Sequence, residues 1–142
     1  MVEVNYWAIL AAVVLSMVIG SMWYGPIFGN TWIKLMGWSK KEIEDGKSDK
    51  NSMMKSYGLQ AIGSFVMAYV LAHSLTYAKN YLGISGVLVG LSTGFWNWLG
   101  FVAPVSLTSV LWEGKPWKLW LLNNGYNLIT LMATGALLSL WA

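Results

Sequence analysis

Few side chains in this 142-residue chain could carry chemistry, and they do not form a catalytic set. The chain has one histidine, His73, and no cysteine, which excludes disulfides, thiolate nucleophiles and cysteine-ligated metals. No Ser-His-Asp set, acid–base pair or phosphate-binding glycine loop accompanies this histidine. We therefore expect that the protein is not an enzyme and that it holds no cofactor and no metal.

The histidine lies between Tyr69 and Tyr77 at helical spacing. A single histidine among tyrosines is typical of a hydrogen-bonded structural residue. A proton relay or a ligand contact is the alternative, because ionisable side chains within membrane segments often serve a function.

Asparagine and threonine recur at helical spacing in two long stretches without charged residues, and we call this pattern the Asn/Thr seam. The first stretch contributes Thr93, Asn97, Gly100, Pro104 and Thr108, and the second contributes Asn123, Asn127, Thr130 and Thr134. An amide exposed to lipid is costly, so both faces should turn inward and hydrogen-bond to each other or to the backbone. Pro104 removes one helical hydrogen bond and frees a carbonyl nearby. The seam predicts that Asn97 joins two helices, with a solute-lined cavity as the alternative.

Trp96 and Trp98 flank this asparagine and point to different faces of the same helix. Both are far from the ends of the uncharged stretch, where membrane tryptophans usually gather. They either fill space opposite neighbouring glycines or line a pocket for a lipid or a flat apolar ligand.

Four runs without charged residues must position these side chains: 4–33, 56–78, 80–112 and 119–142. Each exceeds the roughly 18 to 20 residues that a helix needs to cross a hydrocarbon layer about 30 Å thick. Hydrophobic residues make up 56% of the chain and charged residues only 11%, a composition foreign to soluble domains. We expect a single all-α transmembrane domain over residues 1–142. Its four helices, near 5–24, 57–78, 86–112 and 118–141, should form an integral membrane four-helix bundle.

Lysine is distributed unevenly between the two sides of this expected bundle. The connections after the first and third helices hold Lys34, Lys40, Lys41, Lys47, Lys50, Lys55, Lys115 and Lys118, and the opposite side holds only Lys79. The positive-inside rule then places loops 25–56 and 112–118 in the cytoplasm and both termini outside, in a multi-pass protein of the cell membrane. The chain has no arginine, which argues against nucleic-acid binding.

The long connection 25–56 contains signals for short helical segments. Asn30 is a plausible N-cap and Gly37 a plausible stop for a segment in the headgroup layer. Ser39 and Glu42 match a capping box, which predicts a helical turn from residue 40 to about 45 that ends at Gly46, followed by a solvated loop over 47–52. The alternating charges are typical of a solvated face; a docking site for anionic lipid or a partner protein is the alternative.

Small residues recur at steps of three or four in three of the expected helices. The sets are Ala8, Ala12, Ser16 and Gly20 in the first helix, Ala61, Ser64, Ala68 and Ala72 in the second, and Gly86, Gly90 and Gly94 in the third. Helices in lipid associate through close contact of such residues. We expect these faces to pack against helices of the same chain or of another subunit.

Two stretches, "WYGPIFGNTWIKLMG" (23–37) and "GFVAPVSLTSVLWEGKPWKLWLLNNGYNLITLMATGALLSLW" (100–141), resemble the small bacterial and archaeal membrane proteins of the domain of unknown function 1761 family. The Trp-Tyr-Gly-Pro turn and the Asn-x-Gly-Tyr step are the most specific parts of the resemblance. Many members carry histidine after that Gly-Tyr, where this chain has Asn127. The resemblance implies a multi-pass topology in a prokaryotic cytoplasmic membrane and no particular activity.

Two functions therefore fit the sequence. The first is a structural or accessory role in membrane lipid, as a homo-oligomer or as a subunit of a larger membrane complex; small-residue faces and the lack of ionisable coupling residues favour it. The alternative is a passive channel or carrier for a small solute, built around the Asn/Thr seam.

Overall fold

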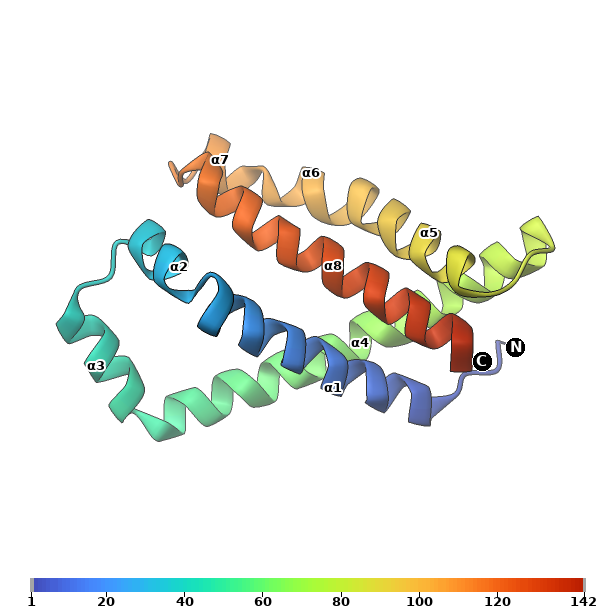
Figure 1. Ribbon diagram of the computed structural model, residues 1–142, viewed down its shortest axis with the longest axis horizontal. Coiled ribbons are helices and arrows are strands. Elements are labelled where there is room, and N and C mark those ends of the chain that lie inside the picture. The colour runs from blue at the N-terminus through green and yellow to red at the C-terminus, as the bar shows by residue number, and fades with distance from the viewer. Residues whose placement is uncertain (1, 142) are drawn as a thin grey trace.

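The computed structural model describes residues 2–141, and every regular element in that range is helical (Figure 1). This confirms the expected all-α class. The longer helices run along the long axis of the molecule, and the two ends of the chain lie at the same end of it (Figure 1).

Helix α1 (Tyr6–Met22) begins after Asn5, whose side-chain oxygen accepts hydrogen bonds from two backbone nitrogens of the first turn. It passes directly into the π-helical segment η1 (Trp23–Ile27). Pro26 lies inside η1, and Gly25 has a non-helical φ of −111° and ψ of −105°. Because proline cannot donate a helical hydrogen bond, the helix is distorted where Pro26 enters.

Helix α2 (Gly29–Met36) ends at Gly37, which adopts a φ of 72° and confirms the expected stop. The expected N-cap at Asn30 is wrong, because α2 begins at Gly29 and Phe28 occupies the N-cap position. The backbone nitrogen of Phe28 donates to the carbonyl of Trp23 over 2.9 Å, so the chain continues from η1 into α2 without a capping side chain.

Helix α3 (Lys40–Ser48) opens with the predicted capping box. The backbone nitrogen of Glu42 donates to Ser39 Oγ over 3.2 Å, and the backbone nitrogen of Ser39 donates to the Glu42 carboxylate over 3.0 Å. The helix continues past Gly46, where the sequence predicted its end.

Helix α4 (Lys50–Leu82) follows after Asp49, whose carboxylate accepts a hydrogen bond from the backbone nitrogen of Ser52 over 3.1 Å. The predicted solvated loop over 47–52 is therefore wrong, because a side-chain cap starts the next helix at once. Most of the connection 25–56 is helical as a result.

The third expected helix is interrupted. It consists of α5 (Val87–Asn97), the π-helical segment η2 (Trp98–Val102), α6 (Ala103–Ser106) and α7 (Thr108–Leu111). Pro104 lies in the first turn of α6, where its missing backbone donor costs no helical hydrogen bond. The expectation of a continuous helix missed this π segment, which widens the turn just before the proline.

Helix α8 (Trp117–Trp141) agrees with the expected fourth helix and is central to the packing. It contacts α1 and α4, and α5 lies along it (Figure 1). The glycines bring α5 and α8 together: a methyl group added to Gly90 would overlap the backbone of Gly135, and one added to Gly94 would overlap the backbone of Leu131.

The buried apolar core joins the four long helical stretches near the end that holds the termini. Its members are Ala8, Ile9, Ala12, Ala68, Leu71, Leu75, Val89, Leu131 and Leu138. They come from the start of α1 and α5 and from the later parts of α4 and α8, which places the core away from α3.

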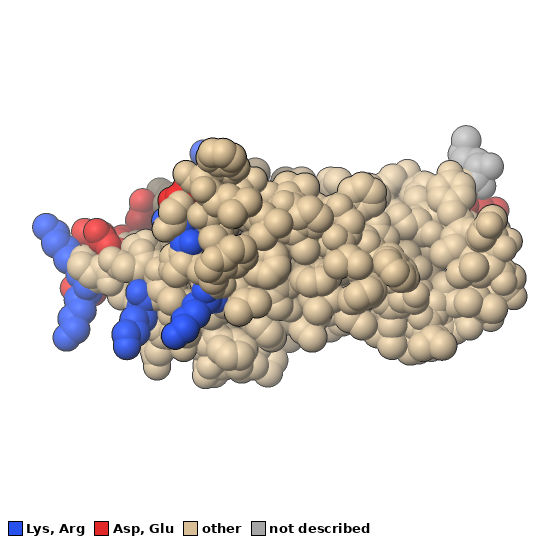
Figure 2. Space-filling view, turned by 90° about the horizontal axis from the view of Figure 1, so that it is seen from above, with Lys and Arg blue, Asp and Glu red and all other residues tan. Residues whose placement is uncertain are grey.

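Three helical stretches within residues 2–141 are long and apolar enough to cross a membrane: Tyr6–Ile27, Lys50–Leu82 and Val87–Leu111. This indicates a membrane-associated protein. Helix α8 is not among them, because its three asparagines lower its mean hydropathy. Figure 2 shows the visible lysines gathered at the end of the molecule opposite the termini.

Candidate functional site: a polar cleft between α1, α4 and α8

A cavity of about 700 Å³ opens at the lysine-rich end, where η1, α2, α3 and the start of α4 surround it. Four aromatic rings line it, from Tyr24, Trp32, Trp38 and Tyr57. The ring of Trp32 lies 4.9 Å from that of Tyr24 and 5.0 Å from that of Trp38, centre to centre. We call this cavity the mouth; aromatic residues are typical of the depth at which a membrane meets water.

A second cavity of about 510 Å³ continues from the mouth and shares Tyr24, Gly25, Trp32, Ser56 and Tyr57 with it. We call it the middle cavity. It extends between α1 and α4 to Ser16, Gln60 and Tyr126, the last from α8. The two spaces therefore adjoin along these walls, and we call this row of adjoining cavities the cleft.

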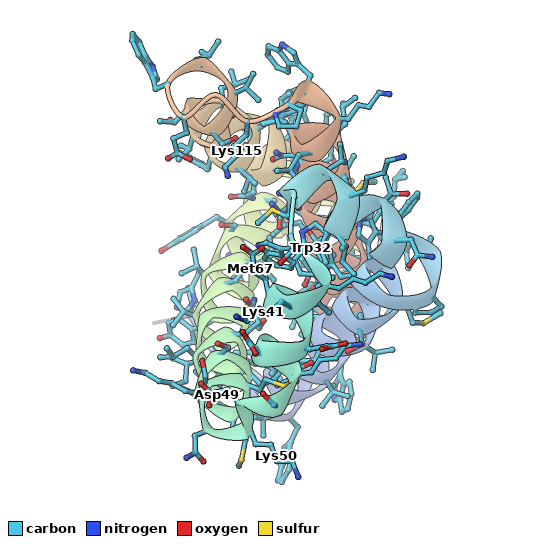
Figure 3. The ribbon with its side chains drawn as sticks, turned by 90° about the vertical axis from the view of Figure 1, so that its left-hand side faces the viewer. Trp32, Lys41, Asp49, Lys50, Met67 and Lys115 are labelled. Carbon is cyan, nitrogen blue, oxygen red and sulfur yellow. The ribbon has the colours of Figure 1, made fainter. Side chains whose placement is uncertain are left out.

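A third cavity of about 170 Å³, which we call the deep cavity, shares Gln60 and Tyr126 with the middle one. Its other lining residues are Gly63, Ser64, Met67, Val102, Asn127, Thr130 and Leu131. Figure 3 looks along the molecule from its lysine-rich end. Trp32 of the mouth and Met67 of the deep cavity lie close together in that view, as expected for a cleft that runs along the long axis.

Helix α4 supplies a polar stripe along the whole cleft. Ser52, Ser56, Gln60 and Ser64 follow one another at four-residue spacing, and each lines at least one of the three cavities. At a rise of about 1.5 Å per residue, the stripe covers roughly 18 Å of the helix axis. Such a stripe faces water or a polar ligand more readily than lipid.

Both π-helical segments border this cleft. Tyr24 and Gly25 of η1 line the mouth and the middle cavity, and Val102 of η2 lines the deep cavity. π-Helical turns inside α-helices occur frequently at functional sites. Their position here therefore marks the cleft as the candidate site.

Side chains of η1 fasten it to α8. Trp23 Nε1 donates to the carbonyl of Leu122 over 3.0 Å, and the Tyr24 hydroxyl donates to Asn123 Oδ1 over 2.7 Å. The ring of Tyr24 also lies 5.3 Å from that of Tyr126, centre to centre. These contacts fix one wall of the cleft.

A family model described as "Protein of unknown function (DUF1761)" matches residues 7–139. The chain belongs to this family. No curated protein and no solved structure matches the chain. The two motifs that carried the resemblance meet in the structure of this family member. Tyr24 of the first contacts Asn123 and Tyr126 of the second, and Trp23 donates to the carbonyl of Leu122.

The two halves of the Asn/Thr seam lie in different places in the structure, and only the second half lies at the cleft. Asn97 Nδ2 donates to the carbonyl of Thr93 over 2.8 Å, within one helix, rather than across to α8. Pro104 and Thr108 are exposed, and the Thr108 hydroxyl bonds to its own helix through the carbonyl of Val105. The first half of the seam therefore does not line the cleft.

The second half of the seam lies at the cleft. Asn123 holds Tyr24, while Asn127 and Thr130 line the deep cavity. Thr130 is 3% exposed, and its hydroxyl has no hydrogen-bond partner within the described residues. The same holds for the hydroxyl of Thr134, one helical turn on.

Sequence reasoning missed Asn124, which joins α6 and α8. Its side-chain oxygen accepts a hydrogen bond from Ser106 Oγ over 2.9 Å, and Trp98 Nε1 donates to its carbonyl over 3.0 Å. Trp120 Nε1 also donates to Ser106 Oγ over 3.0 Å. Asn124 lies three residues before Asn127, and this helical spacing could have pointed to Asn124 in the sequence.

The two tryptophans beside Asn97 lie in different environments. Trp98 is half-buried and packs in the α6–α8 junction through its bond to Asn124, whereas Trp96 is 64% exposed on the outer face of α5. Neither lines the cleft.

His73 is half-buried on α4, away from the cleft. Its Nδ1 donates to the carbonyl of Tyr69 over 2.9 Å, and the two rings lie 4.5 Å apart. No group of three histidine, cysteine or acidic residues suited to a metal occurs among residues 2–141.

The small residues of α1 lie at helix contacts. Ala8, Ala12 and Ser16 are buried, and a methyl group added to Gly20 would lie 3.2 Å from the Tyr126 hydroxyl. Gly86 instead turns the chain before α5, with a φ of 99° that favours glycine.

Proposed function

We propose that α8 forms a fourth membrane-spanning helix, so that the protein is a four-helix bundle with both termini outside and its lysine-rich end in the cytoplasm. Helix α8 has 25 residues and runs beside α5 from the lysine-rich end back to the termini (Figure 1). Its asparagines face protein or the cleft, since Asn124 is buried and Asn123 and Asn127 are half-buried. Lipid exposure of these amides is thus limited.

We propose that this bundle is a carrier for a small solute, with its cleft open to the cytoplasm, and that it performs no covalent chemistry. The observation that supports this function is the row of adjoining cavities that forms the cleft. The row leads from the charged end, along the polar stripe of α4, to the deep cavity between α4, η2 and α8. Solute sites of membrane carriers commonly lie at such a depth, beside distorted helices.

The cleft ends against the buried core, so it is closed toward the outside. Small residues at this closure, Ala12 of α1 and Ala68 of α4, are fully buried and let the two helices approach closely. A carrier must open this contact to release solute on the other side. The α5–α8 contact at Gly90 and Gly135 leaves no room for a path, so the cleft replaces the Asn/Thr seam as the proposed route.

Cysteine labelling tests whether the cleft holds water, since the chain has no native cysteine. Ser56→Cys and Gln60→Cys should react with a membrane-impermeant maleimide only when the lysine-rich side is accessible. Val66→Cys and Ala68→Cys are the controls, because Val66 lies on the exposed outer face of α4 and Ala68 is buried. Both controls should stay unlabelled. If Gln60→Cys reacts from neither side, the cleft is not a solute path.

An accessory role in a complex is the second candidate, and one observation favours it. Residues 51–60 of α4 are exposed throughout, which leaves a long helical face without a covering helix. A partner on this face would shield Met54→Cys in native membranes and expose it after purification, since Met54 is exposed and lines none of the three cavities. Purification in mild detergent would then recover the partner, or a second copy of the chain.

A further inference from the structure

We propose that the deep cavity selects a small uncharged solute that both donates and accepts hydrogen bonds, as polyols and amides do. This inference rests on the proposed carrier function. It is drawn from the juxtaposition of Gln60 on α4 with Asn127 and the unpaired hydroxyl of Thr130 on α8, around one cavity.

The charge distribution along the cleft excludes ions as the preferred cargo. Glu42 and Lys47 line the mouth, while every residue that lines the middle and deep cavities is uncharged. An ion that moved inward would lose its water without meeting an opposite charge, which is costly in a membrane. A neutral solute has no charge to remove from water. It loses only its hydrogen bonds to water, which the cavity can replace.

The deep cavity offers both kinds of hydrogen-bonding group. The amides of Gln60 and Asn127 each provide two donors and an acceptor oxygen, and the Thr130 hydroxyl provides one donor and two acceptor sites. Thr130 is the decisive member, because a buried hydroxyl without a partner is unfavourable and rare in folded proteins. The Thr130 oxygen is covered by its neighbours in this structure, so a bound solute of matching polarity would satisfy it once the side chain turns toward the cavity.

Polarity along the cleft also argues against a lipid as the cargo. Four aromatic rings line the mouth, with Asn30 as its one amide, whereas Gln60 and Asn127 both line the deep cavity. A lipid that entered headgroup outward would place its apolar tail among the amides. The size points the same way, because about 170 Å³ holds only roughly six water molecules at about 30 Å³ each.

Flux through proteoliposomes tests this selectivity with urea and glycerol as probes and sucrose and potassium chloride as comparisons. We expect the wild-type protein to speed osmotic re-swelling with urea or glycerol and to leave the sucrose and potassium chloride traces unchanged. Thr130→Val should reduce that flux several-fold, toward about tenfold, because one hydrogen bond to the solute is lost. Gln60→Leu, at an exposed position, should reduce it as well.

Thr134→Val is the matched control, since Thr134 is also buried with an unpaired hydroxyl but lines none of the three cavities. Its flux should equal that of the wild type, and both valine variants should unfold at the wild-type temperature or above. Equal flux in Thr130→Val and wild type would overturn the assignment of the deep cavity. Potassium chloride flux as fast as urea flux would overturn the selectivity.

Failure of the two proposals can be told apart. If Gln60→Cys is labelled from the lysine-rich side but neither urea nor glycerol passes, the inference about the cargo is wrong and the accessible cleft stands. If Gln60→Cys is never labelled, the carrier function itself is wrong. Passage of water alone, without urea or glycerol, likewise overturns the cargo inference.

Discussion

Asn124 shows what a single amide does in this protein, because both ends of its side chain are bonded. It is 2% exposed; its oxygen accepts from Ser106, and its nitrogen donates to the carbonyl of Trp120 over 3.0 Å. With the indole bonds of Trp98 and Trp120, these contacts form a polar junction between α6 and α8. A fully bonded junction of this kind fixes how two helices are rotated against each other.

Replacement of this amide should therefore be costly. Asn124→Leu should lower the free energy of unfolding by about 1 kcal/mol, because the side-chain hydrogen bonds to Ser106 and Trp120 are lost while the Ser106 hydroxyl keeps the carbonyl of Ala103 as acceptor. Denaturant unfolding in detergent, followed by tryptophan fluorescence, measures the loss. Asn97→Leu is the control and should cost much less, since Asn97 bonds only within its own helix. Equal losses in the two variants would contradict the junction.

At the scale of helices, the contact between α5 and α8 depends on backbone approach. The backbone of each glycine in the pair Gly90 and Gly135 occupies the place where a side chain of the other would lie. Bilayer helices gain stability from such close packing, since lipid supplies no hydrophobic force between them. The α1–α4 pair differs, because its helices separate toward the lysine-rich end and leave the cleft.

Alanine substitution of glycine should destabilise the protein at the tight α5–α8 contact and stabilise it at an open position of α4. Gly90→Ala should lower the free energy of unfolding by about 1–3 kcal/mol, because the added methyl group forces α5 and α8 apart. Gly58→Ala should raise it by roughly 0.5–1 kcal/mol, since Gly58 lies in α4 with open space around it and alanine favours helix. Thermal unfolding of both variants in one detergent checks this. A stabilising Gly90→Ala would show that the contact is absent.

The sequence predicts these elements well where residues close in the sequence decide the structure. It predicts them poorly where contact with another helix decides it. The Ser39–Glu42 capping box and the stop at Gly37 are local, and both were confirmed. Asn123, Asn124 and Asn127 all satisfy helical spacing, but which of them meets α6 depends on the rotation of α8. That rotation depends in turn on the glycine contact with α5, so spacing alone could not select Asn124.

The cleft was missed for the same reason. Ser52, Ser56 and Gln60 fall before and just inside the predicted second helix, so their common stripe became visible only when α4 proved to begin at Lys50. The family was predicted correctly from two motifs, and their meeting beside the cleft is a tertiary fact. Tyr24 and Asn123 are far apart in the sequence, so no pattern of neighbouring residues predicts their contact.

At the scale of the whole molecule, charge decides the orientation that we propose. The lysines of α2, α3 and the turn before α8 gather at one end, as Figure 2 shows for the visible face. Transfer of that end across a membrane would be opposed by each of these charges. The distribution therefore favours a single orientation.

Labelling in whole cells tests this orientation. Lys47→Cys and Lys115→Cys should react with an impermeant maleimide only after the cytoplasm is opened. Asn80→Cys, at the exposed end of α4 on the other side, should react in intact cells and serves as the control. Reaction of either lysine position in intact cells would reverse the proposed topology.

The position of the chain ends has a practical consequence. Val4 packs against the core cluster that includes Leu138, so the start and the end of the chain meet at one end of the molecule (Figure 1). Two copies can therefore be joined head to tail by a short flexible linker that stays on one side of the bilayer. Such a covalent tandem would fix the stoichiometry at two. Comparison of its urea flux per bundle with that of the separate chain would show whether one bundle suffices for transport.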